Sequence, residues 1–340
     1  MAAKVLKKIG VYLFVLIGLS ILVFIIARVI PGDPARQALG PHVSEETVQA
    51  LRVKMNLDKP LVMQYLLWFK DALHLDLGES LLTRRPVIQD IAAYLPATLE
   101  IVLLSAVCMV VGGILFGVLS AKYTGKWLDG LIRILSYLGI VSPAFVWGVL
   151  FMLLFGYLVP ILPTTGRISM SMSAPDHITG LFTLDYLLRG NVSGWWDAFK
   201  HLILPALALM LGGMAQAARL TRGNMVENSM KDYILAERAY GVPENRILTR
   251  YLLKPSLIPT ITVMAMDISS IFGNAFLVEN LFNFPGMSRY GLSAMLNKDI
   301  NAISGVVMVL GIIFIVLNLV SDLIVARLDP RVRLMGGSEE

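Results

Sequence analysis

The chain has 340 residues, of which 56% are hydrophobic and 16% charged, and its mean hydropathy is +0.71. Because soluble proteins usually carry about 25% charged residues, this composition excludes an ordinary soluble domain and predicts an all-helical protein that crosses a membrane several times. The net charge of +5 would suggest nucleic acid in a soluble protein, but membrane topology explains it and no nucleic-acid partner is expected. Cys108 is the only cysteine, so an intrachain disulfide is excluded and we interpret it as a small buried hydrophobe.

Apolar runs of roughly 20 residues are long enough to cross a bilayer as helices. Six such spans are predicted, near 9–30, 97–120, 131–158, 201–220, 257–281 and 302–326. The first run is too long for the apolar part of a signal peptide and no small-residue cleavage site follows it, so we interpret it as a retained helix. Six spans place both ends of the chain on the same side of the membrane.

Basic residues near the ends of the spans predict the orientation, because short loops rich in Lys and Arg stay in the cytoplasm. A cytoplasmic N-terminus places more than half of the 29 Lys and Arg residues on that side, so both chain ends are expected inside the cell. The predicted organisation is an N-terminal span over 1–30, an extracytoplasmic helical segment over 31–96, a membrane core over 97–326 that includes a cytoplasmic loop at 221–256, and a cytoplasmic tail over 327–340.

Two outer segments carry further structure. Ser44 with Glu45 and Glu46 is a typical helix start, and the apolar residues that follow recur at helical spacing: Val48, Leu51 and Met55. A second helix is predicted from Pro60, with an apolar face formed by Leu61, Tyr65, Trp68 and Phe69. We expect two packed amphipathic helices here and not a cofactor pocket. In the loop 159–200, the pair Trp195–Trp196 fits an anchor at the membrane interface.

Motifs for bond chemistry are missing from the sequence. There is no G-x-x-x-x-G-K-[ST] to hold a nucleotide phosphate, no H-E-x-x-H and no G-x-S-x-G. The four histidines lack the spacing of metal ligands: His42, His74, His177 and His201. No catalytic residue, cofactor or metal is therefore expected in this chain, which is predicted to move, anchor or relay something.

Residues 236–255, AERAYGVPENRILTRYLLKP, interrupt the apolar sequence with six charged residues. Gly241 suits the left-handed end of a helix, and Pro243 with Glu244 is typical of the start of another. The pattern predicts a short helical hairpin on the cytoplasmic surface before the chain re-enters the membrane at Leu257. Such a hairpin either docks into a soluble partner or is an ordinary basic loop, and the residues alone leave both open.

Polar residues inside membrane spans are costly and often functional. In the fifth predicted span, Asp267 and Asn274 are seven residues apart, and Ser270 lies between them on the same face. Gln216 and Ser142 are further candidates in the fourth and third spans. These five residues are predicted to line a hydrophilic pathway, with contact to a partner subunit as the alternative.

Other residues of these spans have structural interpretations. Ser142–Pro143 is expected to kink the third span. Glu279 is expected near the surface, and three glycines are expected to allow close helix packing: Gly112, Gly113 and Gly117.

Seven segments, in order along nearly the whole chain, resemble the permease subunits of ABC importers of the dipeptide/oligopeptide/nickel family. They are IPGDPA (30–35), LDKPLVMQYLLWF (57–69), LDLGESLLTRRPV (75–87), LPATLE (95–100), HLILPAL (201–207), FPGMSRYG (284–291) and LDPRVR (328–333). The hairpin resembles the EAA loop of these permeases, since Gly241 matches its glycine and Ala236 its first alanine. It departs from the general motif at Leu235, which replaces the acid, and at Pro255, which comes one residue late, and it is closer to the A-R-A-x-G variant of peptide permeases.

The resemblance implies a type I importer permease fold in a bacterial or archaeal inner membrane, with this chain as the first of two paired permeases. It implies a second homologous permease, two cytoplasmic ATPase subunits that bind ATP and Mg²⁺, and an extracytoplasmic substrate-binding protein. The residues expected to contact the ATPases are Ala236, Glu237, Arg238, Ala239, Gly241 and Arg246. The expected cargo is dipeptides and oligopeptides; the family also carries nickel or metal chelates, opines, glutathione and oligosaccharides. An ion-coupled secondary transporter that uses Asp267 is the more remote alternative.

Overall fold

The structure is a computed structural model that describes residues 2–29, 34–39, 43–54 and 56–328. Regular structure in these residues is helical, apart from an isolated β-bridge between Glu79 and Pro86. The chain divides into two compact units, one formed by 1–95 with 286–315 and the other by 96–285 with 316–340. Residues 30–33, Met55 and the predicted tail from residue 329 onwards lie outside the described residues.

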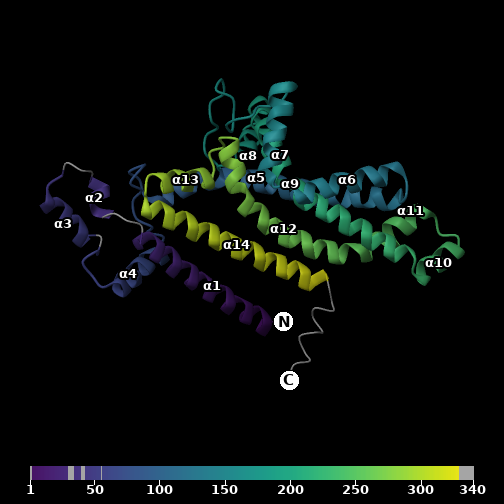
Figure 1. Cartoon of the computed structure of the whole chain (residues 1–340), viewed down its shortest axis with the longest axis horizontal. Coiled ribbons are helices and arrows are strands. Elements are labelled where there is room, and N and C mark those ends of the chain that lie inside the picture. Colours follow the sequence, from purple (N-terminus) through teal and green to yellow (C-terminus); the bar gives the residue numbers. More distant parts are fainter. Residues whose placement is uncertain (1, 30–33, 40–42, 55, 329–340) are drawn as a thin grey trace. The chain divides into compact units, whose positions relative to one another are not determined.

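The first unit contains the N-terminal helices, the start of α5 and the N-terminal part of α14 (Figure 1). Its helices are α1 (Ala2–Val29), α2 (Pro34–Leu39), α3 (Glu45–Lys54), α4 (Leu61–Leu73) and α13 (Met287–Leu296), together with parts of α5 (Val87–Lys122) and α14 (Ile300–Leu328). The two predicted outer helices are thus confirmed as α3 and α4. Ser44 begins α3 by accepting a hydrogen bond from the Thr47 backbone N–H at its Oγ, at 3.4 Å.

The aromatic face of α4 packs against the first apolar helix, α1. The rings of Tyr65 and Phe24 lie 5.5 Å apart in an edge-to-face contact, and Trp68 stands 5.9 Å from Phe24. The hydroxyls of Ser20 and Tyr65 are hydrogen-bonded at 2.8 Å. The predicted apolar face of this helix is therefore used to hold α4 onto α1.

Two buried carboxylates hold the segment that leads into α5. Asp299 accepts a hydrogen bond from the Ser80 hydroxyl at 2.6 Å, and Asp90 accepts one from the Tyr290 hydroxyl at 3.1 Å. Both Asp side chains are fully buried, and Arg85 pairs with Asp90. These contacts join 75–90 to α13 and α14 within the first unit, around an apolar cluster that includes Val87, Ile91, Met287 and Val306.

The second unit is a helical bundle arranged around α9 (Figure 1). Its helices are α6 (Trp127–Val141), α7 (Ala144–Phe151), the π-helix η1 (Met152–Leu158), α8 (Phe182–Leu188), α9 (Val192–Ser229), α10 (Asp232–Ala239), α11 (Glu244–Arg246), the π-helix η2 (Ile247–Leu253) and α12 (Lys254–Leu281), with the remaining parts of α5 and α14. The Thr221 and Thr260 hydroxyls meet between α9 and α12 at 3.4 Å. At the start of α12, the Ser256 hydroxyl accepts a hydrogen bond from Asn228 of α9 at 2.9 Å.

Glycines let α5 approach α9 closely, as predicted. A Cβ placed on Gly113 would stand 2.6 Å from the Ala217 Cβ, and one on Gly117 would stand 2.5 Å from the Thr221 Cβ and 2.9 Å from the Ala218 carbonyl oxygen. Real Cβ atoms do not come this close, so both positions require glycine for the observed packing.

In the part of the chain that the structure describes, four helices are long and apolar enough to cross a bilayer: Val87–Lys122, Val192–Ser229, Glu244–Leu281 and Ile300–Val325. The pair α6 and α7–η1 makes a fifth if it counts as one span, and Gly10–Ile25 of α1 is a shorter apolar helix. The protein is therefore an all-helical, multi-pass membrane protein, while the count of six spans and the orientation stay predictions. The helix that contains the predicted span 201–220 is longer than that span, because α9 begins at Val192 and includes Trp195 and Trp196.

The third predicted span contains a larger break than the expected kink. α6 ends at Val141, α7 starts at Ala144, and the two runs differ in direction by 113°. Ser142 has an extended backbone (φ −90°, ψ 128°), because the ring of Pro143 disfavours helical geometry in the residue before it. The run 131–158 is thus a sharply bent pair of helices.

The close contact at Gly117 leads to a prediction about stability. Gly117→Ala should lower the apparent melting temperature of the purified chain in detergent, because overpacking costs about 1–3 kcal/mol and the Ala218 backbone cannot move aside cheaply. Gly223→Ala is the matched control: it lies in α9 with no atom within 4 Å of the added Cβ. This control should be neutral or stabilising, since alanine favours a helix by about 1 kcal/mol over glycine. Equal melting temperatures for the two variants would contradict the packing argument.

Candidate functional site

A cavity of about 420 Å³ lies between α6, α7, α9 and α12. It brings together all five residues predicted to line a pathway: Ser142, Gln216, Asp267, Ser270 and Asn274. Three glycines also line it, from α6 and α9: Gly139, Gly212 and Gly213. The helix break places Ser142 here, and the shared face of α12 places the three polar residues of that helix. A transport role for these residues stays a prediction at this point.

Asp267 is the unusual group in the cavity. Its Oδ2 is buried and has no hydrogen-bond partner among the residues that the structure describes. An unpartnered carboxylate oxygen at membrane depth is costly and marks a candidate functional residue. None of the described residues forms a group of three His, Cys, Asp or Glu side chains able to hold a metal ion, so the cavity presents one carboxylate among neutral polar groups.

Glu279 lies elsewhere than expected. It is fully buried and accepts a hydrogen bond from the Thr98 hydroxyl of α5, so its predicted position near the surface is wrong. The contact joins the far end of α12 to α5, and Glu279 does not line the cavity.

The predicted hairpin forms at the end of α9, where α10 and α11 lie (Figure 1). Gly241 has φ +75°. Its N–H donates to the Arg238 carbonyl at 2.9 Å, and the Val242 N–H donates to the Glu237 carbonyl at 3.1 Å. This pair of bonds is a Schellman C-cap, which requires a left-handed residue at the Gly241 position. Pro243 then precedes α11 as predicted.

One side of the hairpin is anchored and the other is exposed. Ile234 is fully buried, in a cluster with Met225, Ile247 and Leu252. On the exposed side, Leu235 is 53% and Tyr240 87% accessible. The small predicted contact residues Ala236 and Ala239 are exposed beside them, Arg246 is exposed on α11, and Glu237 is half-buried.

Arg238 pairs within the hairpin. Its Nε donates to the Glu244 carboxylate at 2.8 Å across the Gly241 turn. This ion pair is exposed, and such pairs stabilise by about 0.2–1 kcal/mol. The pair helps to fix the angle between α10 and α11. The sequence analysis did not predict this ion pair.

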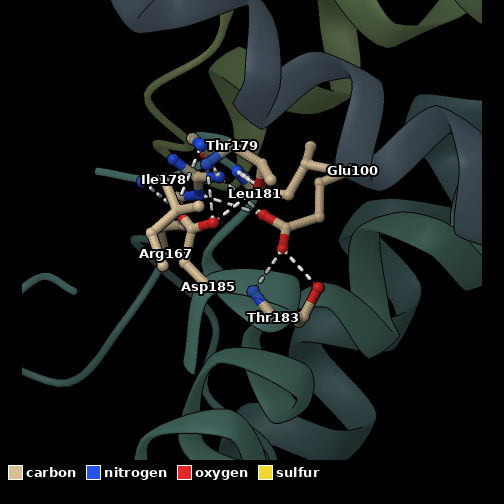
Figure 2. Close-up of polar contacts among 8 residues, drawn as sticks. Glu100, Arg167, Ile178, Thr179, Leu181, Thr183 and Asp185 are labelled. Atoms are coloured by element: carbon tan, nitrogen blue, oxygen red, sulfur yellow. Dashed lines mark hydrogen bonds and ion pairs between the residues drawn. The ribbon is translucent and has the colours of Figure 1, made fainter. Parts of the chain in front are cut away.

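A buried ionic cluster holds the loop between η1 and α9 against α5. Arg167 donates to the Glu100 carboxylate at 2.7 and 3.1 Å and to the Gly180 carbonyl at 2.7 Å. The other Glu100 oxygen accepts from the Thr183 N–H at 2.6 Å. Figure 2 shows Glu100 between Arg167 and Thr183, with Asp185 beside the arginine. Both charged partners are more than nine-tenths buried, so the loop is fixed in place at this point.

Asp185 organises the loop backbone. Burial alone would raise the pKa of Asp185, but hydrogen bonds from the Thr179 side chain and backbone and from Ile178 and Gly180 hold it below its usual value. Burial lowers the pKa of Arg167, and the charge of Glu100 opposes that change. The guanidinium also stacks on the Phe182 ring at 3.6 Å.

A second ion pair lies near the hairpin end of the bundle. Asp129, at the start of α6, accepts hydrogen bonds from Arg222 of α9 at 2.6 and 2.9 Å and from the Ser120 hydroxyl of α5 at 2.6 Å. Three helices meet at this carboxylate. Sequence reasoning missed both ionic clusters, because their partners are 67 and 93 residues apart.

Comparison with known families shows which family the chain belongs to. Residues 113–334 match the family described as "Binding-protein-dependent transport system inner membrane component", and residues 1–102 match the N-terminal family of the same membrane components. The chain belongs to this family. It is a multi-pass inner-membrane permease subunit of an ABC transport system, and it is not an enzyme.

Curated relatives of this permease cover almost its whole length. It is 38% identical to the probable D,D-dipeptide transport system permease protein DdpB of Escherichia coli K12, over 95% of both chains. It is 33% identical to the dipeptide transport system permease protein DppB of Alkalihalophilus pseudofirmus, over 98% of this chain and 100% of that protein. It is also 31% identical to the protein of the same name from Escherichia coli K12, over 97% and 98%. The resemblance stated from the sequence is thereby confirmed.

The Arg167–Glu100 pair of the permease makes a second prediction. Arg167→Met should destabilise the loop strongly, by about 3–5 kcal/mol, because it leaves Glu100 buried without a cation. The double variant Arg167→Met/Glu100→Gln should recover most of this loss, since Glu100 no longer leaves an unpaired buried charge and Asp185 keeps its own hydrogen-bond donors from residues 178–180. The effect is measured by thermal unfolding of the wild type, the two single variants Arg167→Met and Glu100→Gln, and the double variant, together with limited proteolysis of 159–191.

Arg189→Met is the matched control in the same loop, because Arg189 forms an exposed pair with Asp176. It should change stability by less than about 1 kcal/mol. A loss in the double variant equal to that in Arg167→Met would contradict the role of the unpaired charge.

Proposed function

We propose that this permease forms one half of a pathway for dipeptides and oligopeptides, opened and closed by alternating access that partner ATPases drive. The observation that carries the proposal is the continuity of α9. This helix lines the cavity at Gln216 and runs without interruption to Ser229, where the hairpin begins. The intervening 13 residues correspond to about 20 Å at 1.5 Å per residue, so movement of the hairpin is transmitted directly to the cavity.

The proposed partners are those of the importer family. A second homologous permease completes the pathway, and an extracytoplasmic binding protein delivers the cargo. Two cytoplasmic ATPases bind ATP and Mg²⁺, which this chain does not bind. The exposed side of α10, with Ala236, Ala239 and Tyr240, is the surface offered to an ATPase groove, because small residues permit close approach and exposed large apolar residues favour docking.

In this mechanism the permease carries out no bond chemistry. Closure of the ATPases pushes the hairpin, the bundle around α9 tilts, and the cavity changes from facing one side of the membrane to facing the other. The buried Ile234 cluster and the Arg238–Glu244 pair make the hairpin rigid enough to transmit this push. With the predicted orientation, the hairpin faces the cytoplasm.

The peptide cargo is supported by the relatives, which are named as dipeptide permeases. An ion-coupled secondary transporter is not favoured, because the matching family is dependent on binding proteins. Transport that survives removal of the ATPase subunits would favour that rival.

The hairpin makes the prediction that tests the proposal. Gly241→Val should reduce substrate-stimulated ATP hydrolysis and uptake at least tenfold, while the chain still inserts into the membrane. A β-branched residue is strained at φ +75°, so the angle between α10 and α11 must change. Uptake and ATP hydrolysis are measured with the reconstituted importer, and the amount of permease in the membrane is measured by immunoblotting.

Gly125→Val is the matched control. Gly125 also has a positive φ, +77°, with no atom within 4 Å of an added Cβ, but it lies in the turn between α5 and α6. It imposes similar backbone strain outside the hairpin and should retain most of the coupling. Normal uptake and stimulated hydrolysis in Gly241→Val would refute the assignment of the hairpin as the coupling element.

A further inference from the structure

A second, smaller cavity continues along the contact between α6 and α9. It has a volume of about 110 Å³, and its lining includes three arginines: Arg133, Arg219 and Arg222. On α6, Ser136 lines the small cavity, and Gly139, three residues further along, lines the large one. On α9, Arg219 lines the small cavity, and Gln216, three residues before it, lines the large one. Residues three apart lie on the same helix face, so one helical turn separates the two cavities on both helices.

The charges of this small cavity are unbalanced. Arg222 is neutralised by Asp129, whereas Arg133 and Arg219 form no ion pair with any carboxylate among the described residues. The hydroxyl-bearing residues Ser136 and Tyr137 lie in the same lining. Both arginines are exposed, and guanidinium groups without ion pairs beside hydroxyls can bind an anion such as a carboxylate.

The large cavity carries the opposite charge. Asp267 is its carboxylate and has an unpartnered, buried Oδ2 within the described part of the chain. A Cβ on Gly213 would stand 3.5 Å from the Asp267 Cβ, so Asp267 lies at the level of residue 213 on α9. A buried carboxylate oxygen without a donor is suited to a cationic group such as an ammonium.

The separation of the two charges can be estimated from helix geometry. On α9, Arg219 is six residues beyond Gly213. On the antiparallel α6, Arg133 is six residues before Gly139. At a rise of 1.5 Å per residue, the backbone of each arginine therefore lies about 9 Å along the helix axis from the level of the large cavity's glycine. The Arg219 side chain leans toward the N-terminus of α9, and thus toward Asp267, whereas Arg133 on the antiparallel α6 leans away from it. An extended peptide spans about 3.3–3.6 Å per residue, hence roughly 7 Å for a dipeptide and 10 Å for a tripeptide.

We propose that Asp267 and the Arg133–Arg219 pair recognise the two ends of an extended, zwitterionic di- or tripeptide, with its ammonium at Asp267 and its carboxylate at the arginines. The inference rests on the proposed transport function and assigns the substrate class and its direction in the pathway. The carboxylate end points toward the coupling hairpin, since Arg219 lies between the large cavity and that end of α9.

The test uses the complete importer with its binding protein in proteoliposomes. The probes are alanyl-alanine and its C-terminal amide, each at a concentration that saturates the isolated binding protein. The wild-type importer should carry the free acid at least fivefold faster than the amide. Arg133→Gln/Arg219→Gln should lose this preference and at least 80% of acid uptake, while Arg133→Lys/Arg219→Lys should retain a preference.

The matched control is Lys122→Gln/Lys126→Gln, which removes the same charge from the α5–α6 turn, outside both cavities. It should behave as the wild type. If the glutamine variant of the arginines also behaves as the wild type, the proposal is overturned. If wild-type uptake falls to the level of that variant in liposomes without anionic lipid, the arginines hold a lipid headgroup and the proposal is likewise overturned.

Substrate-stimulated ATP hydrolysis separates this inference from the proposed function. It is measured on the wild-type complex with both probes, because the proposed recognition site and the hairpin are both unchanged there. If the wild-type complex shows neither stimulated hydrolysis nor ATP-dependent uptake, the proposed function itself fails. If the wild type transports both probes equally well with ATP, only the recognition of the carboxylate fails.

Discussion

The close contact between α5 and α9 is the constraint on which the second unit depends. In a bilayer, helices gain little from hiding apolar surface, because the lipid is as apolar as they are, so association relies on close packing and polar contacts. Gly113 and Gly117 permit this packing, since neither could carry a Cβ in the observed arrangement. α12, α6 and α7 also pack against α9, which has the cavity on one face and the hairpin at its end. A loosely packed α9 would absorb a push at the hairpin by bending, and the cavity would not respond.

Buried ion pairs also hold the helices and the long loop of the second unit together. Glu100 with Arg167 fixes the long loop on α5, and Asp129 with Arg222 and Ser120 joins three helices near the hairpin. Each carboxylate has several donors, which offsets the cost of removing it from water. Asp267 departs from this pattern, because one of its oxygens lacks a donor among the described residues. This exception is why Asp267 is the carboxylate to which the proposal assigns a ligand.

Local signals predicted local structure well. The Ser44 and Pro60 starts of the outer helices, the positive φ of Gly241 and the convergence of Asp267, Ser270 and Asn274 on one cavity all follow from residue type and helical spacing. Contacts between distant residues were not predictable, since no periodic pattern links Arg167 to Glu100 or Asp129 to Arg222. The position of Glu279 was wrong for the same reason: its burial depends on Thr98 of another helix. Ser142–Pro143 indicated a bend, but its angle of 113° depends on how α7 packs on α9 and α12.

The composition of the large cavity bears on how such a site could accept many cargoes. Gly139, Gly212 and Gly213 contribute no side chains to its wall, and its charge is confined to Asp267. In the proposed mechanism, such a site contacts the ammonium end of a peptide and leaves space for side chains that differ from one peptide to the next. Its few polar contacts also limit how tightly a cargo can bind, and weak binding is an advantage in a pathway because the cargo must leave again. In the proposed mechanism, selectivity among side chains comes from the binding protein that holds the cargo before transport. The two cavities together recognise only the charged ends that free peptides share.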